Sequence, residues 1–513
     1  MSIGSGESRT VLVAVPAHAA GPRSTGGFDL TVPTALPADS TVTLAVPAPT
    51  FPPSPVRPGT TSFVVTFLVA LGISGWAFLQ QGGNPGTLAW ITTVLWTLPC
   101  SASLLGVAGA LRTVRRLRRA RREPPPPPVR DAFLLVVVPT IGRFATLPAL
   151  ERAVLSYRRC LPVHFPRMRV DIVVEQGCEA LARIAALAGP QVRVVVVPRA
   201  YRTPAGTRFK ARANHYAHEL RIREGEARDD VWVLHMDDDT GVDVDTGAAM
   251  ARFVHAQRHR GAAAAHLAQG VLTYPREHGA RRLLWLADAV RPACDLSVFA
   301  LTTGTGTPRA GVHGELLLVR ASVEAGIGWD FGPRAIVEDA QFALLFADRH
   351  PGRSDWFAGR SLGAAPASVT DLVRQRERWA WGLLELSVNR AVPLRHRLLL
   401  LHNMLIWACG PLQHVAVVLA AGALLGDLDT LPVTAVLLPV WAMNIAYQVW
   451  TYWEGLKLNT RASADGRRRW WERIAVVALM PLFSLWEAAG VLCGVIRFVR
   501  HGETTFTVIA KPL

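Results

Sequence analysis

Cysteine is scarce and scattered in this sequence. The six cysteines form no CxxC pair and three fall in apolar segments, which argues against a zinc site or a disulfide framework. The N-terminus lacks the basic start, apolar run and small-residue cleavage site of a signal peptide. No glycine-rich phosphate loop follows the first expected strand, where the chain reads VPTIGRFATLP. These absences argue against a disulfide-stabilised fold and against a nucleotidyltransferase.

Long apolar runs are present instead. Half of the 513 residues are hydrophobic and the mean hydropathy is +0.23, which is high for a soluble protein. Residues 62–80 carry no charge and are long enough to cross a bilayer of about 30 Å, and residues 88–111 repeat the pattern. We therefore predict a transmembrane hairpin at 62–111, after a disordered tail at 1–61 that is rich in proline and alanine.

The positive charge is concentrated at one place. The net charge of +16 would suit a nucleic-acid binder, but seven arginines lie within residues 112–122, directly after the second apolar run. Anionic lipid headgroups and membrane topology account for such a cluster without nucleic acid. Basic loops stay in the cytoplasm, so the N-terminus and the chain after the hairpin are expected there. Residues 112–130, which include PPPPP, are predicted to form a stiff linker.

Residues 131–392 have the pattern of an α/β domain, in which short β-rich runs alternate with amphipathic stretches. Four β-rich runs are mostly apolar before their polar ends, as expected for strands buried on both faces: 132–140, 170–177, 192–198 and 231–239. Ligands of such sheets bind beyond the carboxyl ends of the strands. Glu175 and the aspartates of VWVLHMDDD lie at these ends.

Apolar character returns after this domain. A second transmembrane hairpin is predicted at 398–453, and residues 454–513 are expected to form a basic loop, a membrane-associated helix and a tail. The segment 474–496 contains Glu487 and has arginines at both ends, so an interfacial or re-entrant helix is as good an interpretation as a span. We expect about four spans, in an integral protein of the plasma or inner membrane with a cytoplasmic catalytic domain.

The three consecutive aspartates indicate a divalent cation. One aspartate is common where a strand turns, but Asp237, Asp238 and Asp239 together would repel one another without a positive partner. Mg²⁺ or Mn²⁺ is held by one or two carboxylates together with phosphate oxygens. In extended chain Asp237 and Asp239 point the same way. The segment therefore predicts a metal bound to a diphosphate.

Two further motifs have ordinary interpretations when each is taken alone. Glu338 and Asp339 begin an amphipathic helix, where acidic residues offset the helix dipole. RQRERWAWG, at 374–382, has the spacing Q-x-x-R-W and could be a basic helix at the membrane surface with an interfacial tryptophan. Their combination with the aspartates favours a catalytic site.

Together these motifs resemble glycosyltransferase family 2, which has the GT-A fold. The resemblance covers about 131–392 and rests on VPT, DDD, GVHGELLLV, ED and Q-x-x-R-W in this order. VPRAYRTPAGTRFKARANHYA and VEDAQFALLF are similar to segments of Egghead-type β-1,4-mannosyltransferases and their bacterial relatives. The fold class that this implies is an α/β GT-A domain inserted between transmembrane helices.

The resemblance also implies residue roles. Asp339 matches the general base, and Asp237 or Asp239 matches the metal ligand, with Asp239 favoured as the direct ligand. The residues that would contact the nucleotide or its diphosphate are Glu175, Lys210, Arg212, Asp237, Asp238, Arg376 and Arg378, although Lys210 and Arg212 are equally typical of a solvated basic helix. The residues on the acceptor side would be Gln375, His313 and Trp379, although His313 is more typical of a packing or hydrogen-bonding histidine than of a metal ligand. TTFTVIAK, at 504–511, is similar to the gating loop of cellulose synthase relatives, or is a short terminal strand.

The expected function is therefore an inverting, membrane-bound glycosyltransferase with Mg²⁺ or Mn²⁺ as cofactor. Its partners would be a nucleotide-sugar donor, with GDP-mannose favoured by the resemblance, a lipid-linked or glycan acceptor, and membrane lipids. A processive polysaccharide synthase of the cellulose or hyaluronan synthase type is the nearest alternative, and a non-catalytic membrane scaffold is the alternative from another class. The sequence does not indicate an oligomeric state.

Overall fold

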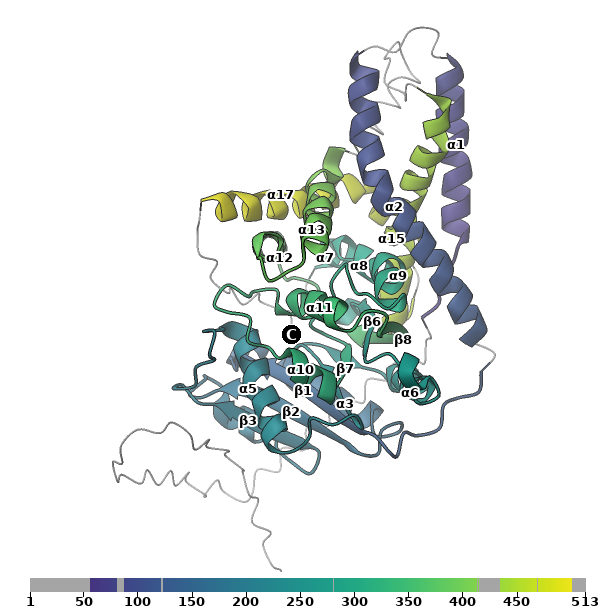
Figure 1. Ribbon diagram of the computed structural model, residues 1–513. Coiled ribbons are helices and arrows are strands. Elements are labelled where there is room, and N and C mark those ends of the chain that lie inside the picture. Colours follow the sequence, from purple (N-terminus) through teal and green to yellow (C-terminus); the bar gives the residue numbers. More distant parts are fainter. Residues whose placement is uncertain are drawn as a thin grey trace, which may run out of the picture.

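The computed structural model describes residues 56–80, 87–120, 123–279, 281–412, 414, 434–467 and 469–500. Most of the expected tail at 1–61, and the whole TTFTVIAK segment, lie outside these residues. Within the described ranges, an α/β domain lies below a group of long helices (Figure 1).

One mixed sheet organises the α/β domain. Its strands follow the order β3-β2-β1-β4-β7-β6-β8-β5. The first four strands of the chain pair in parallel, whereas β7 runs antiparallel to β4. The strands are β1 (Phe133–Thr140), β2 (Met168–Glu175), β3 (Val192–Val197), β4 (Val231–His235), β5 (Gly241–Val242), β6 (Leu267–Thr273), β7 (Leu317–Arg320) and β8 (Ser354–Leu362). The four strands predicted from apolar runs are thus present and form the parallel part of the sheet.

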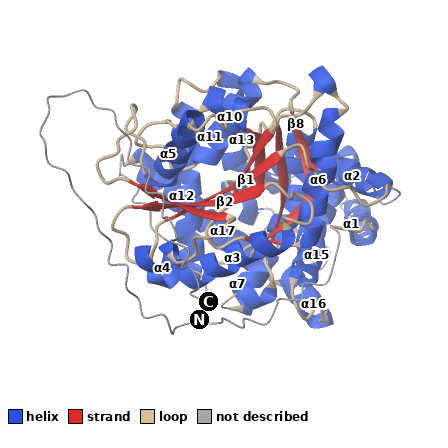
Figure 2. Ribbon diagram, turned by 90° about the horizontal axis from the view of Figure 1, so that it is seen from below, coloured by secondary structure: helices blue, strands red, loops and turns tan. Residues whose placement is uncertain are grey.

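Helices cover both faces of the sheet (Figure 2). Alternate residues of β1 enter two different cores, with Val136 on one face and Val137 on the other. One face packs against α3 (Leu147–Cys160) and α6 (Val244–Arg258), and the other against α5 (Phe209–Arg223), α10 (Ala321–Ile327) and α11 (Glu338–Arg349). Shorter helices are α4 (Leu181–Ala185), α7 (Arg282–Ala287), α8 (Val290–Cys294) and α9 (Ala300–Gly304). Burial on both faces explains why these strands are continuously apolar.

Three helices in the described part of the chain are long and apolar enough to cross a membrane. They are α1 (Thr61–Gln80), residues 89–120 of α2 (Thr87–Ala120) and α17 (Met480–Val499). α1 and α2 stand together beside α15 (Leu438–Ala462), pointing away from the sheet (Figure 1). These helices indicate an integral membrane protein.

The arginine cluster is part of a helix. Residues 112–130 were expected to form a linker, but α2 continues to Ala120. Arg116 pairs with Asp355 at 2.5 Å, and Arg112 donates to the carbonyl oxygen of Gly304 at 3.0 Å. These contacts hold two arginines of the cluster against the α/β domain, so the helix extends onto the domain.

Only part of the predicted second hairpin, 398–453, falls within the described residues. Residues 415–433 lie outside the described residues, and neither α13 (Leu394–Ala408) nor α15 meets the length and apolarity of a span. α16 (Trp470–Ala478) leads into α17, which packs along α12 (Val369–Val388) and α13. α17 runs across the direction of α1 and α2 (Figure 1). Its one carboxylate, Glu487, accepts hydrogen bonds from Arg376, Arg291 and Trp407.

Candidate active site

The three aspartates lie where the sheet ends. β4 stops at His235, and the N–H of Met236 donates to the carbonyl oxygen of Val137 in β1 at 3.0 Å. Asp238 then accepts a hydrogen bond from the Thr140 hydroxyl, at 2.7 Å, at the end of β1. This bond joins the carboxyl ends of two neighbouring parallel strands, the edge at which a ligand of such a sheet binds.

The aspartates differ in accessibility. The side chain of Asp237 is 39% exposed, whereas Asp239 is only 5% exposed. Asp239 accepts from the Thr240 hydroxyl at 3.3 Å, and the same hydroxyl donates to Glu315. The structure therefore presents Asp237 to a ligand more openly than Asp239, which the resemblance favours as metal ligand. Glu315 is a further carboxylate at this edge that sequence reasoning did not single out, although it lies within GVHGELLLV.

Lys210 places a cation inside the acidic cluster. From α5, its ammonium donates to Asp237 and, at 3.1 Å, to the carbonyl oxygen of Gly314, and it lies 3.8 Å from Glu338. Burial opposes the charged ammonium, but Asp237, Glu338 and Asp339 outweigh it and raise the pKa of Lys210. Gly314 has no room for a side chain, because a Cβ would lie 2.6 Å from the Lys210 nitrogen and 3.2 Å from Oδ2 of Asp339.

Glu338 and Asp339 approach the same point from α11. Burial is the main cause that raises the pKa of Glu338 to about 7; Lys210 acts in the opposite direction and Asp339 in the same direction. Oδ1 of Asp339 accepts the N–H of Ala340 at 2.8 Å. Sequence reasoning assigned a role to Asp339 alone, but the structure brings both carboxylates to Lys210.

The two arginines of Q-x-x-R-W have different surroundings. Residues two apart on a helix do not share a face. Burial lowers the pKa of Arg378, and the neighbouring carboxylates that oppose this effect are Glu338, Asp237 and Asp339. Arg378 therefore faces the acidic cluster.

Arg376 faces away from this cluster. Its Nε–H donates to Glu487 at 2.8 Å, and its two Nη groups donate to Asp288 and to Oε1 of Gln375. These bonds use three of the five N–H donors of the guanidinium, and Arg376 is fully buried, with 0% of the residue exposed. The expected contact of Arg376 with the pyrophosphate has no support in these bonds.

Trp379 lies against the same network. The guanidinium carbons of Arg376 and Arg291 lie 4.5 and 4.8 Å from its ring centre. Gln375 also bonds to Arg376. The described contacts of Trp379 and Gln375 therefore include cations.

Glu175 and Arg212 form one pair at the end of β2. Arg212, from α5, donates to both carboxylate oxygens of Glu175 and, at 2.8 Å, to the carbonyl oxygen of Pro198. The Glu175 side chain remains 37% exposed. The structure thus brings together two residues that the sequence assigned to the nucleotide.

His313 lies in the loop before β7, behind the acidic edge. Its ring Nε2 bonds to Asp295 at 2.7 Å, and its backbone N–H donates to Gln269 at 2.9 Å. Burial opposes protonation, but Asp295 outweighs burial and raises the pKa of His313. These contacts match the packing interpretation of this histidine.

The donor set suits a metal that is completed by phosphate. Within the described ranges, no group of three or more His, Cys, Asp or Glu side chains is arranged to hold a metal by itself. Mg²⁺ and Mn²⁺ need only one or two carboxylates when phosphate oxygens supply other ligands. The position of the Lys210 ammonium beside Asp237 shows that this carboxylate stabilises a cation. The aspartates therefore fit such a group.

Comparisons with known proteins give the following similarities. The mannosyltransferase PcManGT from Pyrobaculum calidifontis, solved in complex with GDP-Man and Mn²⁺, aligns with a TM-score of 0.43 and 16% identity over 80% of this chain and 100% of that one. β-1,4-mannosyltransferase bre-3 of Caenorhabditis briggsae is 26% identical over 331 residues, which cover 64% of this chain and 68% of the relative. β-1,4-mannosyltransferase egh of Drosophila melanogaster is 25% identical over 292 residues, covering 56% and 60%. Residues 232–453 match the model for glycosyl transferase family group 2. Residues 232–453 therefore have the sequence of a glycosyltransferase of family 2, and the chain is distantly similar to β-1,4-mannosyltransferases.

Proposed function

We propose that this enzyme transfers a hexose, with inversion, from a nucleotide-diphosphate sugar to a lipid-linked or glycan acceptor. One observation carries the proposal: Lys210, Asp237, Glu338 and Asp339 come from three separate segments and interact at one sheet edge, with Arg378 beside them. Carboxylates for a metal, cations for a leaving diphosphate and a carboxylate base are the groups that such a transfer needs.

The metal would be Mg²⁺ or Mn²⁺, held by Asp237 with Asp238 or Asp239. When bound, it supplies positive charge that offsets the charge developing on the diphosphate. Asp237 is more open to a ligand from solvent than Asp239, because 39% of its side chain is exposed and Asp239 is buried.

The remaining steps use this chain's own side chains. Asp339 takes the proton from an acceptor hydroxyl, and the oxygen attacks the anomeric carbon as the bond from that carbon to the phosphate oxygen breaks. The electron pair leaves with the nucleoside diphosphate. Lys210 and Arg378 are the cations that would stabilise the departing charge, and Glu175 with Arg212 would contact the nucleoside. A single base suffices for a single displacement, which inverts the anomeric centre.

The sequence relatives favour mannose as the sugar. Both bre-3 and egh carry the name β-1,4-mannosyltransferase, so GDP-mannose is the first donor to test. At 25–26% identity, donor choice does not follow from membership of the family.

The membrane helices support a lipid-phase route for the acceptor or product. We propose that α1 and α2 span the membrane, that the segment 398–453 supplies a second hairpin, and that the catalytic domain is cytoplasmic. α17 would lie in the interface, because it runs across α1 and α2 and directs Glu487 into the protein (Figure 1). A carboxylate with three protein donors does not have to enter hydrocarbon.

The test is a donor screen on the purified full chain in detergent with Mg²⁺ or Mn²⁺. GDP-mannose, UDP-glucose and UDP-N-acetylglucosamine are compared for hydrolysis and transfer, and product length is read by mass spectrometry. We expect transfer of one or few sugars, lowered about 10²- to 10⁴-fold by Asp339→Asn. Asp348→Asn, at an exposed position of the same helix, is the matched control.

Full transfer by Asp339→Asn would show that Asp339 is not the base. The failure of every sugar nucleotide to bind with metal would favour a non-catalytic scaffold instead. A long polymer as product would identify the processive alternative.

A further inference from the structure

A cavity of about 700 Å³ lies between α1, α15 and α16, apart from the acidic edge. None of the residues proposed for sugar transfer lines it. Its apolar wall comes from all three helices and includes Val65, Val449, Ile474 and Val477. Such a wall matches a hydrocarbon chain.

The N-terminal segment is fixed over one end of the cavity. The N–H of Gly59 donates to Glu454 at 2.6 Å, and the indole of Trp450 donates to the carbonyl oxygen of Gly59 at 2.7 Å. Glu454, in α15, is only 3% exposed. Gly59 has little room for a side chain, since a Cβ would lie 3.0 Å from Oε1 of Glu454. This end of the cavity is therefore built from ordered, mutually bonded groups.

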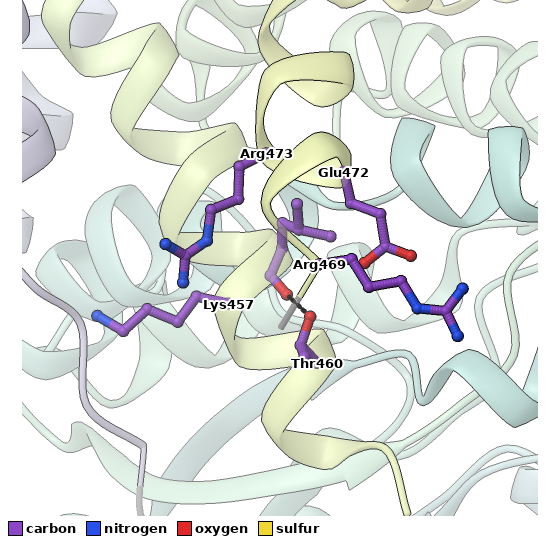
Figure 3. A pocket seen from close by; sticks show the side chains of 6 residues that line it. Lys457, Thr460, Arg469, Glu472 and Arg473 are labelled. Carbon is purple, nitrogen blue, oxygen red and sulfur yellow. Dashed lines mark hydrogen bonds between the residues drawn. The ribbon is translucent and has the colours of Figure 1, made fainter. Parts of the chain in front are cut away.

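Two cations also line the cavity. Arg473 of α16 and Lys457 of α15 point to the same side of the contact between their helices, whereas Arg469 and Glu472 point to the other side (Figure 3). Lys457 donates to Glu454 at 2.7 Å, which leaves two of its three ammonium N–H donors. Arg473 forms no ion pair with any residue that the structure describes, and its guanidinium lies 5.4 Å from the ring centre of Trp453. Lys457 offsets the negative charge of Glu454, so the positive charge of Arg473 is left to attract an anion.

Helix α16, which lines this cavity, carries exposed apolar side chains of the kind found at a membrane surface. Trp470 and Trp471, at the start of α16, are 74% and 38% exposed, and Ile474 is 58% exposed. Tryptophan is enriched at the boundary between headgroups and hydrocarbon. Cations at this depth meet lipid phosphates, while the apolar wall meets acyl chains.

From these features we infer that the cavity is a binding site for an anionic phospholipid of the bilayer. The phosphate would contact Arg473 and Lys457, and one acyl chain would lie along the wall formed by Val65, Val449 and Val477. The site would hold α1, α15 and α16 together. A lipid-phosphate acceptor shares this chemistry, but the absence of the proposed catalytic residues from the lining favours a resident phospholipid.

The experiment compares lipids retained by the full chain. The protein is placed in nanodiscs of phosphatidylcholine, with or without phosphatidylglycerol. Native mass spectrometry of protein released from the nanodiscs then identifies the lipids that stay bound. We expect retained phosphatidylglycerol in preference to phosphatidylcholine. The double variant Lys457→Ala/Arg473→Ala should lower this retention at least about tenfold. Arg500→Ala removes an exposed arginine after α17 that does not line the cavity, and should retain the lipid.

A second variant keeps the charges and fills the space. Ala478→Trp places a large side chain in the cavity and should also displace phosphatidylglycerol, with sugar-nucleotide binding as the check that the domain is folded. Equal retention of the two lipids by the wild type, or unchanged retention by both variants, would overturn the inference. Displacement by a polyprenyl phosphate that is then glycosylated would instead assign the cavity to the acceptor.

Discussion

Arg376 of α12 donates its Nε–H to Glu487 of α17 across 2.8 Å, and both side chains lie inside the protein. Asp288, directly after α7, and Arg291, in α8, join the same network. The one carboxylate of the apolar α17 is thus the anchor that joins this helix to the Q-x-x-R-W motif. The sequence assigns the Q-x-x-R-W motif to substrate contacts, but Arg376 of this motif holds two helices together.

Substitutions of Arg376 and Arg378 should therefore have different effects. We expect Arg378→Ala to lower kcat/KM about 10²- to 10³-fold with little change in Tm, because it removes one cation beside the leaving group. Arg376→Ala should lower Tm, because it leaves Glu487 and Asp288 without their shared donor. Steady-state transfer and thermal unfolding of both variants provide the measurement. If Arg376→Ala lost as much activity as Arg378→Ala at unchanged Tm, a role of Arg376 in binding the substrate would be supported instead.

Glu487→Gln tests the anchor from the other helix. It leaves Arg376 and Arg291 buried with one acceptor fewer, and breaking a buried ion pair of this kind costs about 3–5 kcal/mol. The control is Glu377→Gln, which breaks the more exposed pair of Glu377 with Arg497 and should cost at most about 1 kcal/mol. Denaturant or thermal unfolding in detergent measures both. Similar costs would show that α17 does not depend on this network.

Sequence patterns predicted the parallel strands because burial on both faces leaves a continuous apolar run, as in β1 and β4. They also located the aspartates and the ED pair, since strand ends and helix starts can be read from nearby residues. The partner of Glu487 could not be predicted, because Arg376 lies 111 positions away in sequence. The end of α2 was misplaced for the same reason: Asp355, which pairs with Arg116, comes from β8.

Lys210 should compete with a metal for Asp237. Its ammonium donates to this carboxylate, so binding of a divalent cation requires Lys210 to move or to share the ligand. Like charges about 4 Å apart repel by about 1 kcal/mol in water and about 4 kcal/mol near a protein surface. We expect Lys210→Met to bind Mn²⁺ at least about tenfold more tightly while transferring sugar more slowly.

Calorimetry in the absence of donor measures the affinity of this variant for Mn²⁺. Arg208→Met, at an exposed position before α5, is the control for net charge. Weaker binding of Mn²⁺ to Lys210→Met than to the control would show that Lys210 organises the aspartates rather than competing at them.

Glu338 should make the folded protein less stable as pH rises. Its pKa is raised from 4.5 to about 7 in the folded state, mainly by burial, so between these values the folded state holds a proton that the unfolded state has lost. Stability from the protonated form is present below the unfolded pKa and is lost as pH rises through the folded pKa. At about 1.4 kcal/mol per pKa unit the loss is roughly 3 kcal/mol.

Glu338→Gln removes this titration while keeping the shape of the side chain. We expect the fall in unfolding free energy between about pH 5 and pH 8 to be smaller in this variant than in the wild type. Asp348→Asn, on the same helix with a side chain 46% exposed, should keep the pH dependence of the wild type. If Glu338→Gln and the wild type instead lost stability in parallel across this interval, the ammonium of Lys210 would be keeping Glu338 ionised throughout. Glu338 and Asp339 of α11 would then both be negatively charged at neutral pH.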